Sequence, residues 1–251
     1  MIKIDNITKR FADKEVLKGI SAVFKPGQVN MIIGASGTGK SVLLKCIVGL
    51  EIPDEGSVLY DDRDFIRANR NEQIEIRREI GMLFQGAALF DSKTVEENVR
   101  FPLDVLTDMP MDEKQDRVNH ILARVGLENV NHLMPSELSG GMKKRVGIAR
   151  ALVNNSKYLF CDEPNSGLDP QTSILIDNLI KELTEEYNTT TVVVSHDMNS
   201  VMQIGDYIMF MYQGHKVWDG AKEDVLNAKE KAFNDFVFAN HLMKVLKEQM
   251  G

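Results

Sequence analysis

The feature that most constrains this chain is a glycine-rich run of eight residues, GASGTGKS at Gly34–Ser41. A short apolar run, VNMII, precedes it, and Lys40–Val48 has the character of a helix that ends at Gly49. This order of strand, turn and helix favours phosphate binding, because glycines let backbone amides turn toward an anion and a helix start carries partial positive charge. The run therefore predicts a nucleotide site.

The loop also supplies the two side chains that such a site needs. Lys40 is expected to reach the outer phosphates of the nucleotide. The Ser41 hydroxyl is expected to bind Mg²⁺, a hard cation that prefers oxygen ligands. The residues predicted to surround the phosphates are Gly34, Ala35, Ser36, Gly37, Thr38, Gly39, Lys40, Ser41 and Val42.

Two adjacent carboxylates follow an apolar run further along the chain, in YLFCDE. Asp162 is predicted to hold the magnesium shell, and Glu163 is predicted to accept a proton from the attacking water as general base. An Asp-Glu pair is common, and capping of the turn at Pro164 is the alternative interpretation.

A second apolar run, VVVSHD, ends in a histidine. His196 is predicted to donate a hydrogen bond to the terminal phosphate, and a structural histidine is the alternative. The remaining histidines show no metal-ligand spacing and are expected at the surface; they are His120, His132, His215 and His241.

A second helix start suited to an anion lies about a hundred residues after the first, in LSGGMKKRVGIARAL. Ser139, Gly140 and Gly141 would present a hydroxyl, backbone amides and a helix dipole. A single mononucleotide needs only one phosphate loop. This element must therefore serve another ligand or the nucleotide of another molecule.

The alternation of strands and helices predicts an α/β fold with a mixed, mainly parallel sheet. The first thirty residues alternate apolar and polar side chains, which indicates an antiparallel β subdomain. Later strands are expected in KYLFCDEP, TTTVVVSHD and DYIMFMYQG, with a helix over Gln171–Tyr187. Residues 1–87 and 154–228 are predicted to form the core, 88–153 an inserted helical subdomain, and 229–251 a helical tail with Phe233, Phe236, Val237, Met243 and Leu246 on one face.

Composition excludes several classes of protein. A net charge of −7 argues against a broad nucleic-acid footprint, so no nucleic-acid partner is expected. The basic pairs and runs, Arg77 with Arg78 and Lys143 to Arg145, are expected on solvated helix faces. Cys46 and Cys161 lie in apolar runs and are predicted to be buried reduced thiols. No apolar stretch approaches eighteen residues, so a membrane role requires a partner.

The order of these motifs resembles the ATPase domain of ATP-binding cassette (ABC) transporters over nearly the whole chain. The motifs that carry it are Gly34–Ser41, Gln85, LSGGM, CDEP, SGLD and VSHD. The resemblance implies a P-loop NTPase core of the RecA-like type, ATP and Mg²⁺ as cofactors, and a head-to-tail dimer of two copies. In that dimer Ser139–Gly141 of one subunit would close over ATP on the other, and permease subunits would be the membrane partners.

The same resemblance assigns three more residues. Phe11 matches the aromatic residue that stacks on adenine, with a core phenylalanine as the alternative. Gln85 matches the glutamine that touches the magnesium and the attacking water. Asp169 matches the loop that couples the two sites of the dimer, with a helix cap before Pro170 as the alternative.

Two further features resemble the MlaF-like ATPases of MCE-type phospholipid transport systems: Met142 after LSGG, and residues 84–103. This resemblance implies a hydrophobic cargo, an MCE-domain lipid-binding partner, and a place on the cytoplasmic face of the inner membrane. Met142 could instead simply fill a packing site in another small-molecule transporter. The segment around Phe84 to Leu103 is expected to pass the motion of hydrolysis to a permease.

Two classes outside transport are weaker alternatives. A soluble mechanical ATPase of DNA repair or translation normally has a long coiled-coil insertion or a duplicated cassette, and neither is evident in the 251 residues. A P-loop kinase needs an acceptor pocket and a lid, and it would leave the LSGG segment unexplained.

Overall fold

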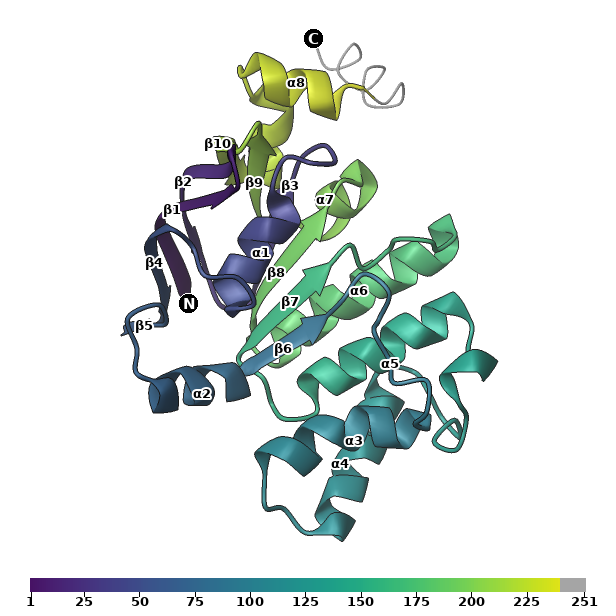
Figure 1. Ribbon diagram of the computed structural model, residues 1–251. Coiled ribbons are helices and arrows are strands. Elements are labelled where there is room, and N and C mark those ends of the chain that lie inside the picture. The colour runs from purple at the N-terminus through teal and green to yellow at the C-terminus, as the bar shows by residue number, and fades with distance from the viewer. Residues whose placement is uncertain (240–251) are drawn as a thin grey trace.

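The computed structural model describes residues 1–239 and contains two β-sheets with helices around them (Figure 1). A four-stranded sheet has the order β2-β1-β4-β5, and a six-stranded sheet has the order β10-β9-β3-β8-β7-β6. The strands are β1 Ile2–Phe11, β2 Lys14–Phe24, β3 Gln28–Ile33, β4 Glu55–Tyr60, β5 Arg63–Asp64, β6 Ile80–Leu83, β7 Tyr158–Asp162, β8 Thr190–Ser195, β9 Tyr207–Tyr212 and β10 His215–Ala221.

The helices connect these strands and cover the six-stranded sheet on both faces. The α-helices are α1 Lys40–Val48, α2 Arg70–Arg78, α3 Val95–Leu106, α4 Met111–Arg124, α5 Gly140–Leu152, α6 Pro170–Glu186, α7 Met198–Ile204 and α8 Lys231–Val237. Within residues 1–239 there are also the short 3₁₀ segments η1 Pro135–Glu137 and η2 Lys222–Asn227.

The six-stranded sheet is parallel except for the β9–β10 pair. All of β8 and all but one end residue of β3 and of β7 are buried, which is why these strands appear in the sequence as continuous apolar runs. Successive side chains point to opposite faces. In β3, Ile32 packs with α1 and the four-stranded sheet, whereas Met31 and Ile33 pack with the helices α3 to α8.

The predicted α/β fold with a mixed sheet and an antiparallel N-terminal sheet is confirmed. Helix α1 begins at Lys40 and ends at Gly49, as expected, and Gly49 takes the left-handed conformation of a glycine C-cap. The three later strands and the helix after Pro170 are also present. The strands β4, β5, β6 and β10 and the helices α2 and α7 were not anticipated, since they are short or only partly apolar.

Residues 88–153 contain α3, α4, η1 and α5, so their helical character is confirmed. The predicted apolar face of α4 and the turn after it is buried; it comprises Val118, Ile121, Leu122 and Val125. These side chains belong to the same core as α5, α6 and one face of the sheet. The division into the ranges 1–87 with 154–228, 88–153 and 229–251 stays a prediction.

One prediction about the basic runs is wrong. Arg77 and Arg78 are exposed, but Lys144 in the second run is buried inside the molecule, and Arg145 is half-buried and donates to the Gly126 carbonyl. Three basic residues in succession cannot all lie on one helix face, because α-helical residues are 100° apart around the axis. The middle residue of this run faces inward.

The remaining sequence predictions concern single residues. Cys46 and Cys161 are free and buried, and burial raises the pKa of the Cys46 thiol to about 11. His120, His132 and His215 are exposed, while His241, Met243 and Leu246 lie outside the described residues. Within residues 1–239, no helix is both long and apolar enough to cross a membrane. In α8, Phe233 is buried and stacks on Trp218 with ring centroids 4.2 Å apart.

A buried asparagine ties the segment after β6 to α3. The Asn98 amide accepts a hydrogen bond from the Phe90 N–H at 2.8 Å and donates to the carbonyls of Phe90, Lys93 and Thr94. Asn98 is fully buried, so water cannot replace these bonds in its absence.

Replacing Asn98 by alanine should lower the free energy of unfolding by about 2 to 4 kcal/mol, because four hydrogen bonds between this buried side chain and the main chain are lost. Chemical denaturation measures this change. Asn119 is exposed and bonds only the Asn131 amide among residues 1–239, so Asn119→Ala should change stability by less than about 0.5 kcal/mol. Equal effects of the two substitutions would contradict the analysis.

Candidate nucleotide site

The phosphate loop lies between the end of β3 and the start of α1. Gly34 has a φ of 151°, and a Cβ there would meet the Met211 carbonyl at 2.4 Å. Gly37 and Gly39 have φ values of 79° and 102°. Only glycine adopts these conformations without strain. Residues 35–37 are exposed, so the bend they form is open to an anion.

Lys40 is folded back onto its own loop. Its Nζ donates to the carbonyls of Gly34 at 2.8 Å and Ala35 at 3.1 Å, and its side chain is largely buried. Burial lowers the pKa of Lys40, although the nearby carboxylates of Glu163 and Asp162 act in the opposite direction. A buried amine held only by carbonyls can exchange them for the stronger charge of a phosphate.

Ser41 and Asp162 are brought together from residues 121 positions apart, with the Ser41 hydroxyl donating to Asp162 Oδ1 at 3.3 Å. Burial raises the pKa of Asp162, and the Ser41 hydrogen bond opposes this effect. A hydroxyl and a carboxylate are the hard oxygen donors that Mg²⁺ prefers. Because Mg²⁺ keeps waters and takes phosphate oxygens as further ligands, these two protein groups fit it.

Glu163 and His196 form the second pair of the site. His196 Nδ1 lies 2.8 Å from one carboxylate oxygen of Glu163 and 3.0 Å from the other. The His196 side chain is mostly exposed, which argues against a purely structural histidine. A neutral imidazole has a single N–H. It therefore cannot donate to Glu163 and to a phosphate at the same time.

Glu163 also has an unusual backbone conformation, with a φ of 48° in the left-handed region. A long side chain rarely adopts this conformation, which costs energy and persists only where neighbouring contacts hold it. The Glu163 N–H donates to the Val194 carbonyl at 2.9 Å, and its own carbonyl accepts from the Ser166 N–H at 3.1 Å. The strain lies at the residue predicted to act as general base.

Gln85 reaches the same region from the segment after β6. Its side-chain amide donates to Ser166 Oγ at 3.2 Å, in the loop between β7 and α6. The carbonyls of Ala87 and Ala88, both in left-handed conformations, accept hydrogen bonds from Arg150 of α5. The segment after β6 is thus held both to the β7–α6 loop and to α5.

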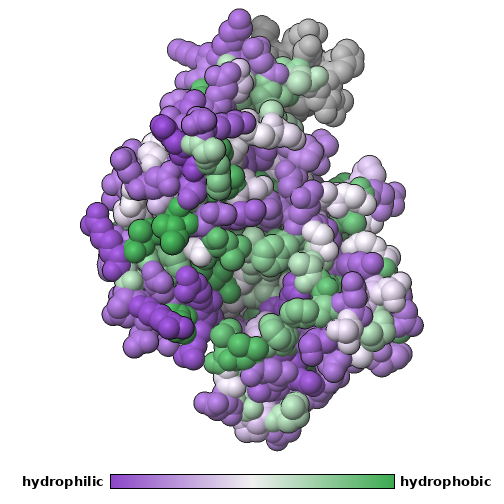
Figure 2. Space-filling view, in the orientation of Figure 1, coloured by the Kyte–Doolittle hydropathy of each residue, from purple (hydrophilic) through white to green (hydrophobic). Residues whose placement is uncertain are grey.

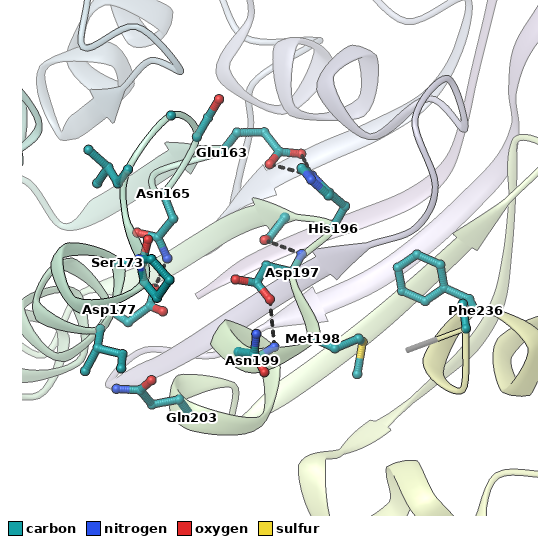
Figure 3. Close-up of a pocket in the computed structure, with 17 residues that line it drawn as sticks. Glu163, Asn165, Ser173, Asp177, His196, Asp197, Met198, Asn199, Gln203 and Phe236 are labelled. Atoms are coloured by element: carbon teal, nitrogen blue, oxygen red, sulfur yellow. Dashed lines mark hydrogen bonds and ion pairs between the residues drawn. The ribbon is translucent and has the colours of Figure 1, made fainter. Parts of the chain in front are cut away.

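Beside this site lies a cavity of about 770 Å³, whose lining extends from Glu163 and His196 to Phe236 (Figure 3). In Figure 3, Asn165 and Asp177 point toward each other below Glu163. The Asn165 amide donates to Asp177 Oδ1 at 2.8 Å and to Ser200 Oγ at 2.9 Å. Asp177 is only 2% exposed, and burial raises its pKa.

Phe11 is not a core residue. Its side chain is 43% exposed at the end of β1, and Lys9 Nζ lies 5.3 Å from the ring centroid. The alternative interpretation of Phe11 as core packing is therefore wrong. An exposed aromatic face remains available for stacking on a base.

The start of α5, the second helix start suited to an anion, is capped by its own Ser139 and packs against α6. The Ser139 side chain accepts a hydrogen bond from the Met142 N–H, and a Cβ at Gly141 would lie 2.6 Å from Thr172 Cγ2. Asp169 caps α6 by accepting from the N–H groups of Gln171 and Thr172, so the helix-cap interpretation of Asp169 holds as local structure. It does not exclude a further role at an interface.

The two helix starts belong to different parts of the molecule. Helix α1 contacts β2, β7 and β8, whereas α5 contacts α3, α4, α6 and β6. Figure 1 shows α1 and α5 well separated. Within one chain, the Ser139–Gly141 segment does not belong to the phosphate loop at Gly34–Ser41.

Comparison with known proteins decides the family. Residues 17–166 match the family model described as ABC transporter. The chain belongs to the ABC transporter family. This match covers more than half of the 251 residues, from within β2 to the loop after β7, and includes the phosphate loop, Gln85, Ser139–Gly141 and Glu163. As an ABC ATPase domain, the chain binds ATP with Mg²⁺ and is an ATPase.

Curated relatives agree with this assignment. The probable ribonucleotide transport ATP-binding protein mkl of Mycobacterium tuberculosis (strain ATCC 25618 / H37Rv) is 36% identical over 236 residues, which are 94% of this chain and 66% of the relative. The methionine import ATP-binding protein MetN of Escherichia coli (strain K12) is 40% identical over 231 residues, which are 90% of this chain and 67% of the relative. The chain thus spans about two thirds of these relatives.

Solved structures show the same fold. The ATP-binding cassette MJ0796, solved as a dimer in a post-hydrolysis state with ADP and Pi, has a TM-score of 0.79 and 35% identity, covering 88% of this chain and 99% of its own. The cbiO1 protein of Clostridium perfringens, part of the transporter complex cbiONQ, has a TM-score of 0.84 and 31% identity, with 98% of each chain covered.

Sequence reasoning missed two groups at this site. Lys144 was assigned to solvent but lies beside Gln85 and Glu163. The buried set of Asn165, Asp177 and Ser200 was not singled out. The available signal for Asp177 was its place among the apolar residues of ILIDNLI, where a carboxylate interrupts an otherwise inward-facing helix stripe.

Burial of Asp177 generates a pH-dependent prediction. Its folded-state pKa is raised, so the folded protein binds this proton more tightly than the unfolded chain. The unfolding free energy should therefore fall as pH rises from the unfolded pKa through the folded one. Asp177→Asn lacks this dependence. Its stability relative to the wild type should increase over that acidic window and become constant near neutral pH, as measured by urea denaturation between pH 4 and 7. A pH-independent difference would contradict the prediction.

Proposed function

We propose that this chain is the ATP-hydrolysing subunit of a membrane ABC transporter and that two copies work head to tail. ATP bound at Gly34–Ser41 of one subunit is covered by Ser139, Gly140 and Gly141 of the second copy, and hydrolysis reopens the dimer. The chain lies on the cytoplasmic face of the inner membrane, attached through integral permease subunits, and binds no nucleic acid.

The observation that carries this proposal is the separation of the two helix starts within one chain. The phosphate loop supplies backbone amides, Lys40 and Ser41 to one face of a nucleotide. The exposed start of α5 at Ser139 and Gly140 points to an anion that this chain does not itself hold. A second copy, turned end to end, supplies that anion. The ATP-binding cassette MJ0796, which is similar to this chain, was solved as a dimer.

Glu163 acts as the general base in this proposal. It directly follows Asp162, the last residue of β7. The proposed magnesium ligand and the proposed base are therefore neighbours in the chain, at the same end of the strand. When bound, Mg²⁺ neutralises charge on the phosphates, and Ser41, Asp162 and Gln85 are the groups that would hold it. Glu163 accepts the proton of the water that attacks the terminal phosphorus.

His196 has two successive partners. In the structure, His196 bonds Glu163. The neutral imidazole has one N–H, and in that form His196 leaves the carboxylate when the terminal phosphate arrives and donates to that phosphate. The freed Glu163 carboxylate can then accept the water proton. The exposure of the His196 side chain leaves room for this change.

Three residues complete the nucleotide site. Phe11 stacks on adenine with its exposed ring. Gln85 orients the attacking water. Because it belongs to the segment after β6, a movement of Gln85 is passed along that segment to the helices that follow it. Asp169 holds the start of α6 at the dimer interface, next to the loop that carries Glu163 and Ser166.

A groove of about 300 Å³ between α3 and the β6 side of the core is the proposed permease contact. Its lining includes Phe84, Phe90, Phe101 and Leu106, and the rings of Phe90 and Phe101 lie 4.8 Å apart. Three large aromatic side chains exposed beside one groove are typical of a protein-binding surface. Figure 2 shows hydrophobic residues over the side of α3 that faces the hydrophilic surface of α2.

For the cargo, we propose phospholipid or a related hydrophobic molecule, delivered through an MCE-domain lipid-binding partner. Met142 and the aromatic segment of residues 84–103 support this proposal. Met142 is partly buried and packs against the core next to Gly141.

Import of a small polar molecule is the second candidate, and the names of the relatives favour it. The MetN proteins are named for methionine import, and mkl for ribonucleotide transport. The ATP site is the same in both cases. The cargo is selected by the membrane partners, so only a measurement on the complex separates these candidates.

Glu163→Gln should bind ATP normally but hydrolyse it about 10²- to 10⁴-fold more slowly, because the amide cannot accept the water proton. Trapped ATP should hold two subunits together, giving a dimer by light scattering in the presence of Mg-ATP. Hydrolysis at the wild-type rate would remove Glu163 from the role of base. Lys40→Ala is the companion variant: it should lose ATP affinity and therefore remain monomeric in the same experiment.

Cargo class is tested on the complex purified from native membranes. With phospholipid as cargo, mass spectrometry should find phospholipid enriched in the complex over the surrounding membrane, and the MCE-domain protein should copurify. ATP hydrolysis by the reconstituted complex should respond to the lipid and not to added methionine or ribonucleotide. Stimulation by one of those small molecules, without lipid enrichment, would replace this proposal with the second candidate.

A further inference from the structure

Lys144 is a buried lysine that the mechanism above does not use. It lies in α5, two residues after Met142, and only 4% of its surface is exposed. Its Nζ donates to the main-chain carbonyl of Gln85 and, at 3.2 Å, to that of Glu163. A single side chain of α5 therefore contacts both the segment after β6 and the residue assigned as general base.

This arrangement is unfavourable for stability alone. Taking an ammonium group out of water is costly, and carbonyl dipoles compensate less than a carboxylate does. Burial accordingly lowers the pKa of Lys144, and electrostatic interactions with Cys161, Asp162 and Glu163 oppose this effect. Lys114 is the contrasting case, since this other buried lysine is paired with Asp104 at 3.1 Å.

The contacts of Lys144 close a ring of hydrogen bonds. The Gln85 side chain donates to Ser166 Oγ at 3.2 Å, and the Ser166 N–H donates to the Glu163 carbonyl at 3.1 Å. Lys144 donates to that same carbonyl and to the Gln85 carbonyl. Without Lys144, the only link in this ring between the Gln85 segment and Glu163 passes through Ser166.

The carbonyl that Lys144 holds belongs to the strained residue of the site. Glu163 has a φ of 48°, which an unsupported glutamate would leave for an ordinary conformation. Rotation of this peptide would change the direction of the Glu163 side chain and its position relative to His196. Two donors on the Glu163 carbonyl, Lys144 Nζ and the Ser166 N–H, oppose that rotation.

We propose that Lys144 is a positioning residue that fixes the Glu163 backbone to the Gln85 segment, so that a displacement of that segment moves the general base. The inference rests on the proposed function of Glu163. It concerns alignment of the base and not the binding of ATP, since Lys144 approaches the site from α5 and bonds no residue of the phosphate loop within residues 1–239.

The test is Lys144→Met in the full-length chain, with steady-state hydrolysis of Mg-ATP as the readout. Methionine has a similar length and keeps the buried packing but cannot donate. The kcat should fall about tenfold or more, the range typical for removing a group that orients a reacting residue, while KM for ATP changes less than about threefold. Lys144→Gln, whose amide carries two N–H donors, should recover part of the lost kcat.

Lys114→Met is the matched control, because it also removes the charge of a buried lysine, in the helices away from Glu163. It should lower the melting temperature but leave kcat near the wild-type value. If Lys144→Met lowers kcat no more than Lys114→Met does, or raises KM by the same factor as it lowers kcat, the positioning role is wrong. If Lys144→Met does not fold, Lys144→Leu, which also cannot donate a hydrogen bond, replaces it in the same comparison with Lys114→Met.

Failure of the underlying function has a different signature. Wild-type hydrolysis by Glu163→Gln would remove the general base itself, whatever the Lys144 variants do. Slow hydrolysis by Glu163→Gln together with wild-type kcat in Lys144→Met would leave the base in place and reject only the positioning role.

Discussion

The site depends on the parallel alignment of three buried strands. Ile33 at the end of β3 is paired with Ser195 at the end of β8, and Asp162 at the end of β7 is paired with Val194. The three strands therefore end at the same edge of the sheet, and whatever follows each strand is delivered to one place. The phosphate loop, the Asp162–Glu163 pair and His196 are near one another because the strands before them are buried on both faces and cannot shift register without exposing apolar side chains.

The two faces of the sheet have different tasks. On one face, α1 and the four-stranded sheet form a core that fixes the phosphate loop. On the other, α3 to α8 form a core that carries Ser139–Gly141 and the aromatic groove. The segment after β6 passes from the sheet into the second group of helices, and Gln85 at its start bonds the loop of Glu163 through Ser166. In the proposed function, a change at the terminal phosphate would reach α3 through few covalent and hydrogen-bonded steps.

The sequence alone was sufficient for the elements whose chemistry is local. Glycines and a lysine at fixed spacing predict the phosphate loop, and continuous apolar runs predict β3, β7 and β8. It was insufficient for β6, which has only four residues, and for Lys144, because a basic residue in a helix is ordinarily at the surface. The inward direction of Lys144 follows from carbonyls supplied by Gln85 and Glu163, 59 and 19 positions away in the chain. These partners lie outside α5, so the pattern of apolar and polar residues within the helix could not have predicted them.

Lys40 and Lys144 make similar hydrogen bonds but lie in different surroundings. Both are buried amines that bond main-chain carbonyls, and burial lowers the pKa of both. The loop around Lys40 includes the exposed residues 35–37, so an arriving phosphate can displace its carbonyl partners. Lys144 is only 4% exposed and lies between α5, the segment after β6 and the end of β7. Lys40 is therefore suited to exchange partners during each cycle, and Lys144 to keep its partners together while they move.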